Sequence, residues 1–155
     1  MFTSEIEQHF FMNHLNSNMK VLEYGSGQST KEIAQKVKSI ISIEHQTNWY
    51  NQLVNDIPNN CKLILKTPDL HYIEGGDCGT YEQFKSYIEL PINYGPYDLI
   101  LIDGRARVSC ASIVHKMANE DTLIFIHDYH REEYKECGKY LKLIDICETM
   151  AKFKL

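Results

Sequence analysis

The sequence predicts an α/β protein with a Rossmann-like, three-layer fold. Helices are expected on both faces of a mainly parallel seven-stranded sheet that closes with a C-terminal antiparallel hairpin. Short apolar runs, several of which end in an acidic residue, alternate with segments of helical periodicity. This alternation predicts a parallel sheet, because parallel strands need such long connections between them. The 155 residues, 43% of them hydrophobic, suit one domain with a single core, so we expect residues 1–155 to fold as one unit.

The first elements are an N-terminal helix and an alternating segment. Over residues 3–15 a Thr/Ser start precedes Ile6, Phe10 and Leu15 at near-helical spacing, which predicts an amphipathic helix. Residues 20–66 then form the predicted cofactor-binding half. Its elements are strands at residues 20–24, 40–44 and 62–66, with helices at about 29–37 and 46–56 between them.

The second half, residues 67–155, opens with an irregular segment over residues 67–79 that contains Pro68 and three glycines. A loop of this length in a small domain usually serves a function, so it is the candidate substrate loop. The remaining elements follow in order. They are helices over 81–90 and 105–119, strands over 97–102 and 122–126, a short helix or turn over 131–138, and a pair of strands over 140–155.

A glycine turn follows the first predicted strand. Gly25 and Gly27 allow the backbone to turn sharply and to lie against a ligand, and Ser29 or Thr30 can begin the next helix. Glu44 ends the next strand about twenty residues later, the spacing at which a carboxylate reaches a ribose diol. Together the turn and the acid predict a nucleoside ligand.

Acidic residues follow the predicted parallel strands at one edge of the sheet. Ligands of such sheets bind beyond the carboxyl ends of the strands, and acids in register there favour a cationic ligand. The acids expected on this rim are Glu23, Glu44, Asp69, Asp103 and Asp128.

Composition excludes several classes of function. The net charge of -5 and the absence of a Lys/Arg block argue against general nucleic-acid or membrane-surface binding. No stretch has membrane-spanning length, and the N-terminus lacks the basic and then apolar order of a signal peptide, so we expect a cytoplasmic protein. Five cysteines without a C-x-x-C pair indicate free thiols and neither a zinc cluster nor a disulfide framework.

Four sequence motifs follow one another along the chain: L-E-Y-G-S-G, S-I-E-H, Y-D-L-I-L-I-D-G and L-I-F-I-H-D. They resemble the successive motifs of class I S-adenosylmethionine-dependent methyltransferases, and the resemblance covers nearly the whole chain. Within that superfamily, G-S-G-Q-S-T, I-E-H-x-x-x-W-Y and I-D-G-R-A-R-V-x-C-A are similar to small uncharacterised bacterial and viral members. The resemblance therefore implies S-adenosylmethionine as cofactor and S-adenosylhomocysteine as product.

The resemblance also implies roles for residues. Glu23 and the turn of Gly25, Ser26 and Gly27 would hold the methionine end of the cofactor. Glu44 would accept both ribose hydroxyls. His45 would lie near the adenine, and Asp69 is the nearest match to the acid that meets the adenine amine. Asp103 would face the methionine amine or the acceptor.

A nicotinamide dinucleotide is the competing cofactor, and two residues argue against it. Thr30 stands where the third glycine of G-x-G-x-x-G permits close packing of helix and strand. Glu23 precedes the turn, where its carboxylate would repel a pyrophosphate. A cofactor that has a positive centre and no phosphate suits this carboxylate better.

Candidate substrate and catalytic residues lie in the second half. Arg107 is expected to point inward, where it either pairs with Asp103 or Asp128 or binds an anionic group, whereas Arg105 should be more exposed. Tyr81 is a candidate for the acceptor pocket. The substrate-binding candidates are thus Arg107, Asp128 and Tyr81.

The catalytic candidates are Asp103, His127 and His130, since a histidine at the rim can act as general base for a hydroxyl acceptor. Asp103 and Asp128 also match two of the carboxylates with which catechol-type O-methyltransferases bind magnesium. Tyr129 stands where that pattern has an amide oxygen, so we expect no metal site.

The preferred function is methyl transfer to an unidentified acceptor, with a hydroxyl or carboxylate oxygen of a sugar or small acid as the favoured target. The alternative is a non-catalytic cofactor-binding or partner subunit, because the chain lacks the insertions that usually close an acceptor pocket. A homodimer would be one way to complete such a pocket.

Overall fold

The computed structural model describes residues 2–75 and 78–155. Its strands are β1 (Lys20–Tyr24), β2 (Ser39–Glu44), β3 (Cys61–Leu65), β4 (Tyr97–Ile102), β5 (Ala118–Ile126), β6 (Lys142–Cys147) and β7 (Met150–Lys154). Its α-helices are α1 (Glu5–Met12), α2 (Gln28–Ala34), α3 (Thr47–Leu53), α4 (Lys85–Glu89) and α5 (Arg107–Ile113). The described residues also form 3-10 helices at Leu90–Tyr94, Val114–Lys116 and Glu132–Lys139.

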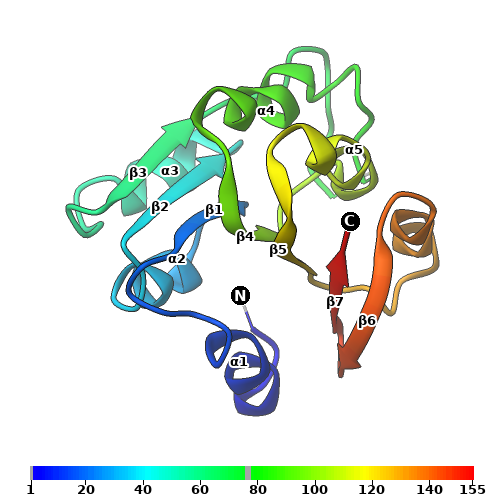
Figure 1. The fold of residues 1–155 in the computed structure, drawn as a ribbon. Coiled ribbons are helices and arrows are strands. Elements are labelled where there is room, and N and C mark those ends of the chain that lie inside the picture. Colours follow the sequence, from blue (N-terminus) through cyan, green and yellow to red (C-terminus); the bar gives the residue numbers. More distant parts are fainter. Residues whose placement is uncertain (1, 76–77) are drawn as a thin grey trace.

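The seven strands form one sheet in the order β3-β2-β1-β4-β5-β7-β6 (Figure 1). Strands β1 to β5 are parallel, and β7 runs antiparallel to both β5 and β6. The predicted fold class, including the C-terminal antiparallel hairpin, is confirmed. The order reverses between β1 and β4, which is where ligands of open α/β sheets bind.

Alternating residues of the central strands face opposite layers. Leu22 and Tyr24 of β1 pack in the cluster that contains residues of α4 and α5, whereas Val21 packs in the cluster that contains residues of α1 and α2. Residues 99–102 of β4 alternate in the same way. Burial on both faces explains why these strands are continuous apolar runs. Figure 1 shows α1 and α2 on one side of the sheet and α4 and α5 on the other.

The largest differences from the predicted boundaries lie at helix ends. The predicted helix over residues 105–119 comprises α5 and a 3-10 turn, and β5 already begins at Ala118. Tyr97 pairs with Ala118, and the Thr122 hydroxyl donates to the Tyr97 carbonyl at 2.7 Å, so this exposed polar segment is held in the sheet. The helix predicted over 3–15 is shorter, since Ser4 caps α1 and the helix ends at Met12.

The predicted substrate loop is irregular in its described part, and its residues 76–77 lie outside the described residues. The helix predicted from Tyr81 begins only at Lys85, after a turn over Tyr81 to Phe84. All five cysteines are free thiols. Within residues 2–75 and 78–155, every helix is too short or too polar to cross a membrane.

Candidate functional site

A cavity of about 340 Å³ opens at the carboxyl ends of β1, β2, β4 and β5, the edge at which the sequence places the ligand. Its walls come from the turns that follow these strands, from α3 and α5, and from the loop before α4. The residues that line it are Gly25, Ser26, Glu44, His45, Gln46, Trp49, Glu74, Asp103, Gly104, Arg105, Arg107, Asp128 and Arg131.

The floor of the cavity is a close contact between two glycine turns. Gly25 follows β1 with a φ of 89°, and a Cβ there would lie 2.6 Å from the Cα of Gly104. A Cβ on Gly104 would lie 2.0 Å from the hydroxyl oxygen of Tyr87. Both positions therefore require glycine, Gly25 for its left-handed backbone and both for the close approach. Gly27 has an extended backbone, and a Cβ there would find its nearest atom 4.0 Å away.

Glu44 ends β2 with its carboxylate at the cavity. Oε2 accepts hydrogen bonds from the amide of Ser26 at 3.0 Å and from its hydroxyl at 2.7 Å. Oε1 accepts from the amides of His45 and Gln46, both at 2.8 Å. Burial alone would raise the pKa of Glu44, but hydrogen bonds from His45, Gln46 and Ser26 outweigh it and lower the pKa. Glu44 is therefore an ionised acceptor in a fixed orientation.

The outer wall joins α3 to the candidate substrate loop. The indole N–H of Trp49 donates to the carbonyl of Ser26 at 2.7 Å, which holds α3 against the glycine turn. Glu74 lies 3.2 Å from Nε2 of His45 and 2.5 Å from the guanidinium of Arg105. Glu74 thus connects the loop to both sides of the cavity.

Glu23 does not border the cavity, so the expected rim of five acids is wrong at this position. It is fully buried and accepts hydrogen bonds from the hydroxyls of Ser29 (2.7 Å), Thr30 (2.6 Å) and Ser42 (2.6 Å). Strand alternation explains the difference, because Glu23 shares its face with Val21, toward α2. Burial raises the pKa of Glu23 to about 7 despite the three hydroxyl donors.

An ion-pair network forms the wall that follows β4 and β5. Nη2 of Arg107 lies 3.4 Å from Oδ1 of Asp103 and 3.1 Å from Oδ2 of Asp128. Arg107 also donates to the carbonyls of Gly104 and His127. The prediction that Arg107 points inward and pairs with Asp103 or Asp128 is confirmed, since it contacts both and is buried.

His127 lies behind this wall and does not border the cavity. Its Nδ1 is 2.9 Å from Oδ1 of Asp103, and its Nε2 is 3.0 Å from Oε2 of Glu7, a residue of α1. Both ring nitrogens thus face carboxylates, so neither presents a lone pair to the cavity. His130, the other histidine proposed as a base, is exposed and lies outside the cavity lining.

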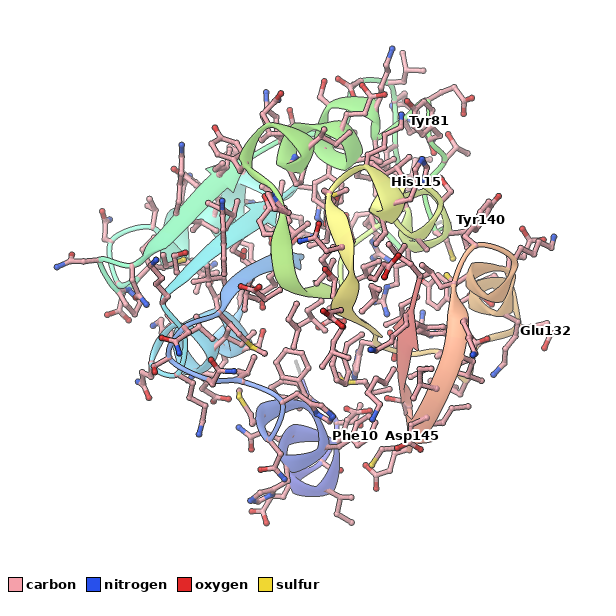
Figure 2. The ribbon with its side chains drawn as sticks, viewed as in Figure 1. Phe10, Tyr81, His115, Glu132, Tyr140 and Asp145 are labelled. Atoms are coloured by element: carbon pink, nitrogen blue, oxygen red, sulfur yellow. The ribbon has the colours of Figure 1, made fainter. Side chains whose placement is uncertain are left out.

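Two further predicted site residues lie away from the cavity. Asp69 caps α4: it accepts from the amide of Ser86 at 2.7 Å and from its hydroxyl at 2.5 Å, and it is exposed. Asp69 does not lie on the rim because the chain after β3 turns toward α4 before it reaches this residue. The hydroxyl of Tyr81 donates to Glu89, and Figure 2 places Tyr81 at the periphery of the molecule.

Asp103, His127 and Asp128 each offer one potential metal-ligand atom, and these atoms lie within 4.8 Å of one another. They do not fit a divalent cation as they are arranged. Arg107 already contacts both carboxylates, and Nδ1 of His127 faces Asp103 at 2.9 Å. A metal would have to displace a buried guanidinium and an imidazole N–H.

Sequence reasoning did not identify several residues of the site. The sequence assigns no role to Trp49. Arg105 is more exposed than Arg107, as predicted, but its pairing with Glu74 is not foreseen. The residues missed are Glu7, Gln46, Trp49, Glu74, Arg105, Arg131 and Thr149. Trp49 had a usable signal, since the third helix begins at Thr47, shortly after Glu44, and places its first turn at the ligand edge.

No protein-family model and no curated protein matches this chain. Solved structures do. A methyltransferase-like protein from Silicibacter pomeroyi superposes with a TM-score of 0.75 at 19% sequence identity and covers 100% of this chain and 88% of its own. SMU.1697c from Streptococcus mutans, in complex with S-adenosylhomocysteine, gives 0.60 at 14% identity and covers 100% of both chains.

Precorrin 8w decarboxylase from Methanobacterium thermoautotrophicum gives a TM-score of 0.65 at 12% identity and covers 100% of this chain and 92% of its own. Most of the similar structures are methyltransferases that use S-adenosylmethionine. At these identities the similarity establishes the class I methyltransferase fold. Function must be argued from the site itself.

Proposed function

We propose that this chain binds S-adenosylmethionine in the cavity and transfers its methyl group to a nucleophilic acceptor. The observation that carries the proposal is the position of Glu44, whose carboxylate borders the same cavity as the glycine turn after β1. The fold supports the same cofactor, since most similar structures are methyltransferases that use it. When bound, this cofactor supplies a sulfonium methyl group that a nucleophile accepts by in-line displacement.

The groups around the cavity suit this cofactor. Glu44 is oriented to accept the ribose hydroxyls, one of which would replace the Ser26 hydroxyl at Oε2. The open space beside Gly27 leaves room for the methionine end to approach the backbone. Asp103 would lie opposite its ammonium group. Carboxylates also stabilise the positive sulfonium by Coulomb attraction.

The charge around the cavity favours this cofactor over a dinucleotide. Four carboxylates line the cavity, those of Glu44, Glu74, Asp103 and Asp128. Its three arginines, Arg105, Arg107 and Arg131, each form an ion pair with at least one of these carboxylates. A pyrophosphate would have to compete for the arginines, whereas a cation leaves these ion pairs in place.

The proposed acceptor is a hydroxyl or carboxylate oxygen of a sugar or small acid. Arg131 supports this choice: its side chain is 45% exposed, and it lines the cavity beside Asp128, 3.4 Å from Oδ2. It therefore has N–H groups that can bind an anionic or hydroxylated acceptor. Asp103 is the one catalytic candidate that lines the cavity.

Isothermal titration of the protein with S-adenosylhomocysteine, with NADH as the comparison ligand, tests the cofactor. We expect saturable one-site binding of the former, weakened about tenfold to a hundredfold by Glu44→Ala, since a charged hydrogen-bond acceptor is lost. Glu120→Ala, at an exposed position of β5, is the matched control and should bind like the wild type. Binding of NADH alone would overturn the proposal.

The alternative function is a cofactor-binding subunit that is completed by a second copy of this chain. One observation favours it: β6 is the outer strand of the sheet, and Leu143, Ile144 and Ile146 on it are 42%, 46% and 49% exposed. Exposed apolar edges of this kind commonly pair with another chain. The molar mass in solution, measured beside a labelled methyl-transfer assay on the isolated protein, separates the two functions.

A further inference from the structure

Glu7 of α1 is a fully buried carboxylate that lies outside the cavity. The sequence Ser4-Glu5-Ile6-Glu7 fits a capping box, a pattern in which the acid reaches back to the start of its own helix. Ser4 does cap the helix, accepting from the amide of Glu7 at 3.1 Å. The Glu7 side chain, however, turns inward, so capping alone does not explain its burial.

The carboxylate of Glu7 is held on both oxygens. Oε2 accepts from the amide and the hydroxyl of Thr3, both at 2.8 Å, and lies 3.0 Å from Nε2 of His127. Oε1 accepts from the amide of Thr149 at 3.2 Å and from its hydroxyl at 2.5 Å. Among residues 2–75 and 78–155, His127 is the cationic partner that lies within 4.0 Å of Glu7.

His127 bridges this buried carboxylate and the carboxylate at the cavity. Nδ1 lies 2.9 Å from Oδ1 of Asp103 and 3.7 Å from Oδ1 of Asp128. A neutral imidazole would direct one lone pair at a carboxylate, so the arrangement fits an imidazolium that donates from both nitrogens. The groups that face it from the surrounding elements are Glu7 (α1), Asp103 (after β4), Asp128 (after β5), Arg107 (α5) and Thr149 (before β7).

The protonation of all three groups agrees with this geometry. Burial alone would lower the pKa of His127, but Asp103, Asp128 and Glu7 outweigh it and raise the pKa. Burial alone would raise the pKa values of Glu7 and Asp103, and their hydrogen bonds and the charge of His127 lower both. His127 therefore rests as a cation between two anions, which prevents it from acting as a base in this state.

We propose that Glu7 is a positioning residue for the methyl transfer proposed above, acting through His127 to keep the cavity carboxylate of Asp103 ionised and oriented. His127 and Arg107 both contact the same oxygen of Asp103, at 2.9 Å and 3.4 Å, so together they set how this carboxylate faces the cavity. Glu7 keeps His127 charged and in place. The N-terminal helix is thereby part of the site. The role in methyl transfer rests on the proposed function, whereas the link between Glu7 and His127 rests on the geometry alone.

The first test is the NMR titration of the His127 imidazole in the protein without ligand, with its signal identified by its loss in His127→Asn. Glu7→Gln keeps the size of the side chain and removes the charge, so we expect His127 to titrate at lower pH than in the wild type. Glu5→Gln, at an exposed position of the same helix, should leave the titration unchanged. A role limited to helix capping would lower the melting temperature in Glu7→Gln without moving the titration, and that result would overturn the link.

The second test is a double-mutant cycle on the affinity for S-adenosylhomocysteine. We expect Glu7→Gln to weaken binding roughly three- to tenfold in the wild type and less than about twofold in an Asp103→Asn background, because the two residues act through one contact. An equal loss in both backgrounds, or none in the wild type, would overturn the positioning role. If the wild-type protein itself bound no S-adenosylhomocysteine, the proposed function would fail while the NMR titration still decided the link.

Glu7→Asp answers the same question should Glu7→Gln not fold. It keeps the charge but draws the carboxylate back from His127 by one methylene group. A shift of the His127 titration in the same direction as expected for Glu7→Gln, but smaller, supports the link. A titration identical to that of the wild type would contradict it.

Discussion

The wall of the cavity that follows β1 and β2 holds its carboxylate mainly with hydroxyl and backbone-amide donors, whereas the wall that follows β4 and β5 holds two carboxylates with an arginine. Glu44 accepts from the Ser26 hydroxyl and from three backbone amides, and the His45 imidazole lies 3.1 Å from its Oε1. Asp103 and Asp128 instead share the buried guanidinium of Arg107. A carboxylate held by neutral donors keeps a net negative charge for a ligand, whereas one held by a cation is largely neutralised.

The two walls therefore differ in what a ligand or a substitution can change. The first can exchange a hydroxyl donor for a ribose hydroxyl at little cost, since both are uncharged. The second is expensive to disturb, because removal of one charge breaks a buried ion-pair network and leaves it unbalanced. We therefore expect changes in the first wall to alter binding, and changes in the second wall to alter stability as well.

The first prediction concerns the wall that follows β4 and β5, where we expect the greatest loss of stability. Arg107→Met removes the cation between Asp103 and Asp128, and we expect it to lower the free energy of unfolding by about 3–5 kcal/mol, measured by urea denaturation. Arg105→Met is the matched control. Arg105 pairs with the half-exposed Glu74, so its loss should cost no more than about 1 kcal/mol. Equal losses in the two variants would remove the distinction between a buried network and a surface pair.

The next effect concerns Glu23, which lies beneath the first wall and receives neutral donors only. Its pKa of about 7 in the folded state lies above the ordinary value of 4.5, so the folded state binds the proton more tightly than the unfolded state. The stability that this proton contributes is complete below pH 4.5 and is lost as the pH rises through about 7, on the order of 3 kcal/mol in all.

Glu23→Gln should therefore flatten this part of the pH dependence. We expect the free energy of unfolding of the variant, relative to the wild type, to increase between pH 5 and pH 8 in urea denaturation. Glu120→Gln, at an exposed position, controls for the change in net charge. A constant difference between variant and wild type across this range would indicate that Glu23 titrates at its ordinary pH.

Local patterns predicted the parts of the site that depend on one strand and the turn after it. The strands at residues 20–24 and 97–102 have the predicted bounds, and Glu44 and Asp103 lie at the cavity because each directly ends or follows a strand. Glu23 could have been placed correctly as well. Residues of a strand alternate in direction, and Glu23 is in phase with Val21, which faces α2.

The rest depended on contacts that no local pattern specifies. Ser4 and Glu7 fit a capping box, in which the acid reaches back to the start of its own helix, yet tertiary packing buries Glu7 against His127 and Thr149. Asp69 has the residue type of a ligand-binding acid, but the backbone after β3 turns toward α4 before this residue is reached. Such placements follow from the path of the loops, which periodicity does not determine.

A smaller effect tests whether Asp69 belongs to the cofactor site. Asp69→Ala removes the cap of α4, and we expect it to lower the free energy of unfolding by about 1 kcal/mol. Because Asp69 lies outside the cavity, the affinity for S-adenosylhomocysteine in isothermal titration should stay within about twofold of the wild type. A loss of affinity of about tenfold would restore Asp69 as a residue that contacts the cofactor.

The smallest expected effect concerns Trp49, the single tryptophan of the chain. Trp49→Phe keeps an aromatic ring at the cavity and removes the N–H that donates to the Ser26 carbonyl at 2.7 Å. One neutral hydrogen bond is worth about 0.5–1.5 kcal/mol, so we expect a two- to tenfold loss of affinity for S-adenosylhomocysteine in isothermal titration. Tyr50→Phe, on the same helix but outside the cavity lining, is the control. If Trp49→Phe bound the ligand like the wild type, the indole N–H would not be needed to hold the Ser26 turn in place.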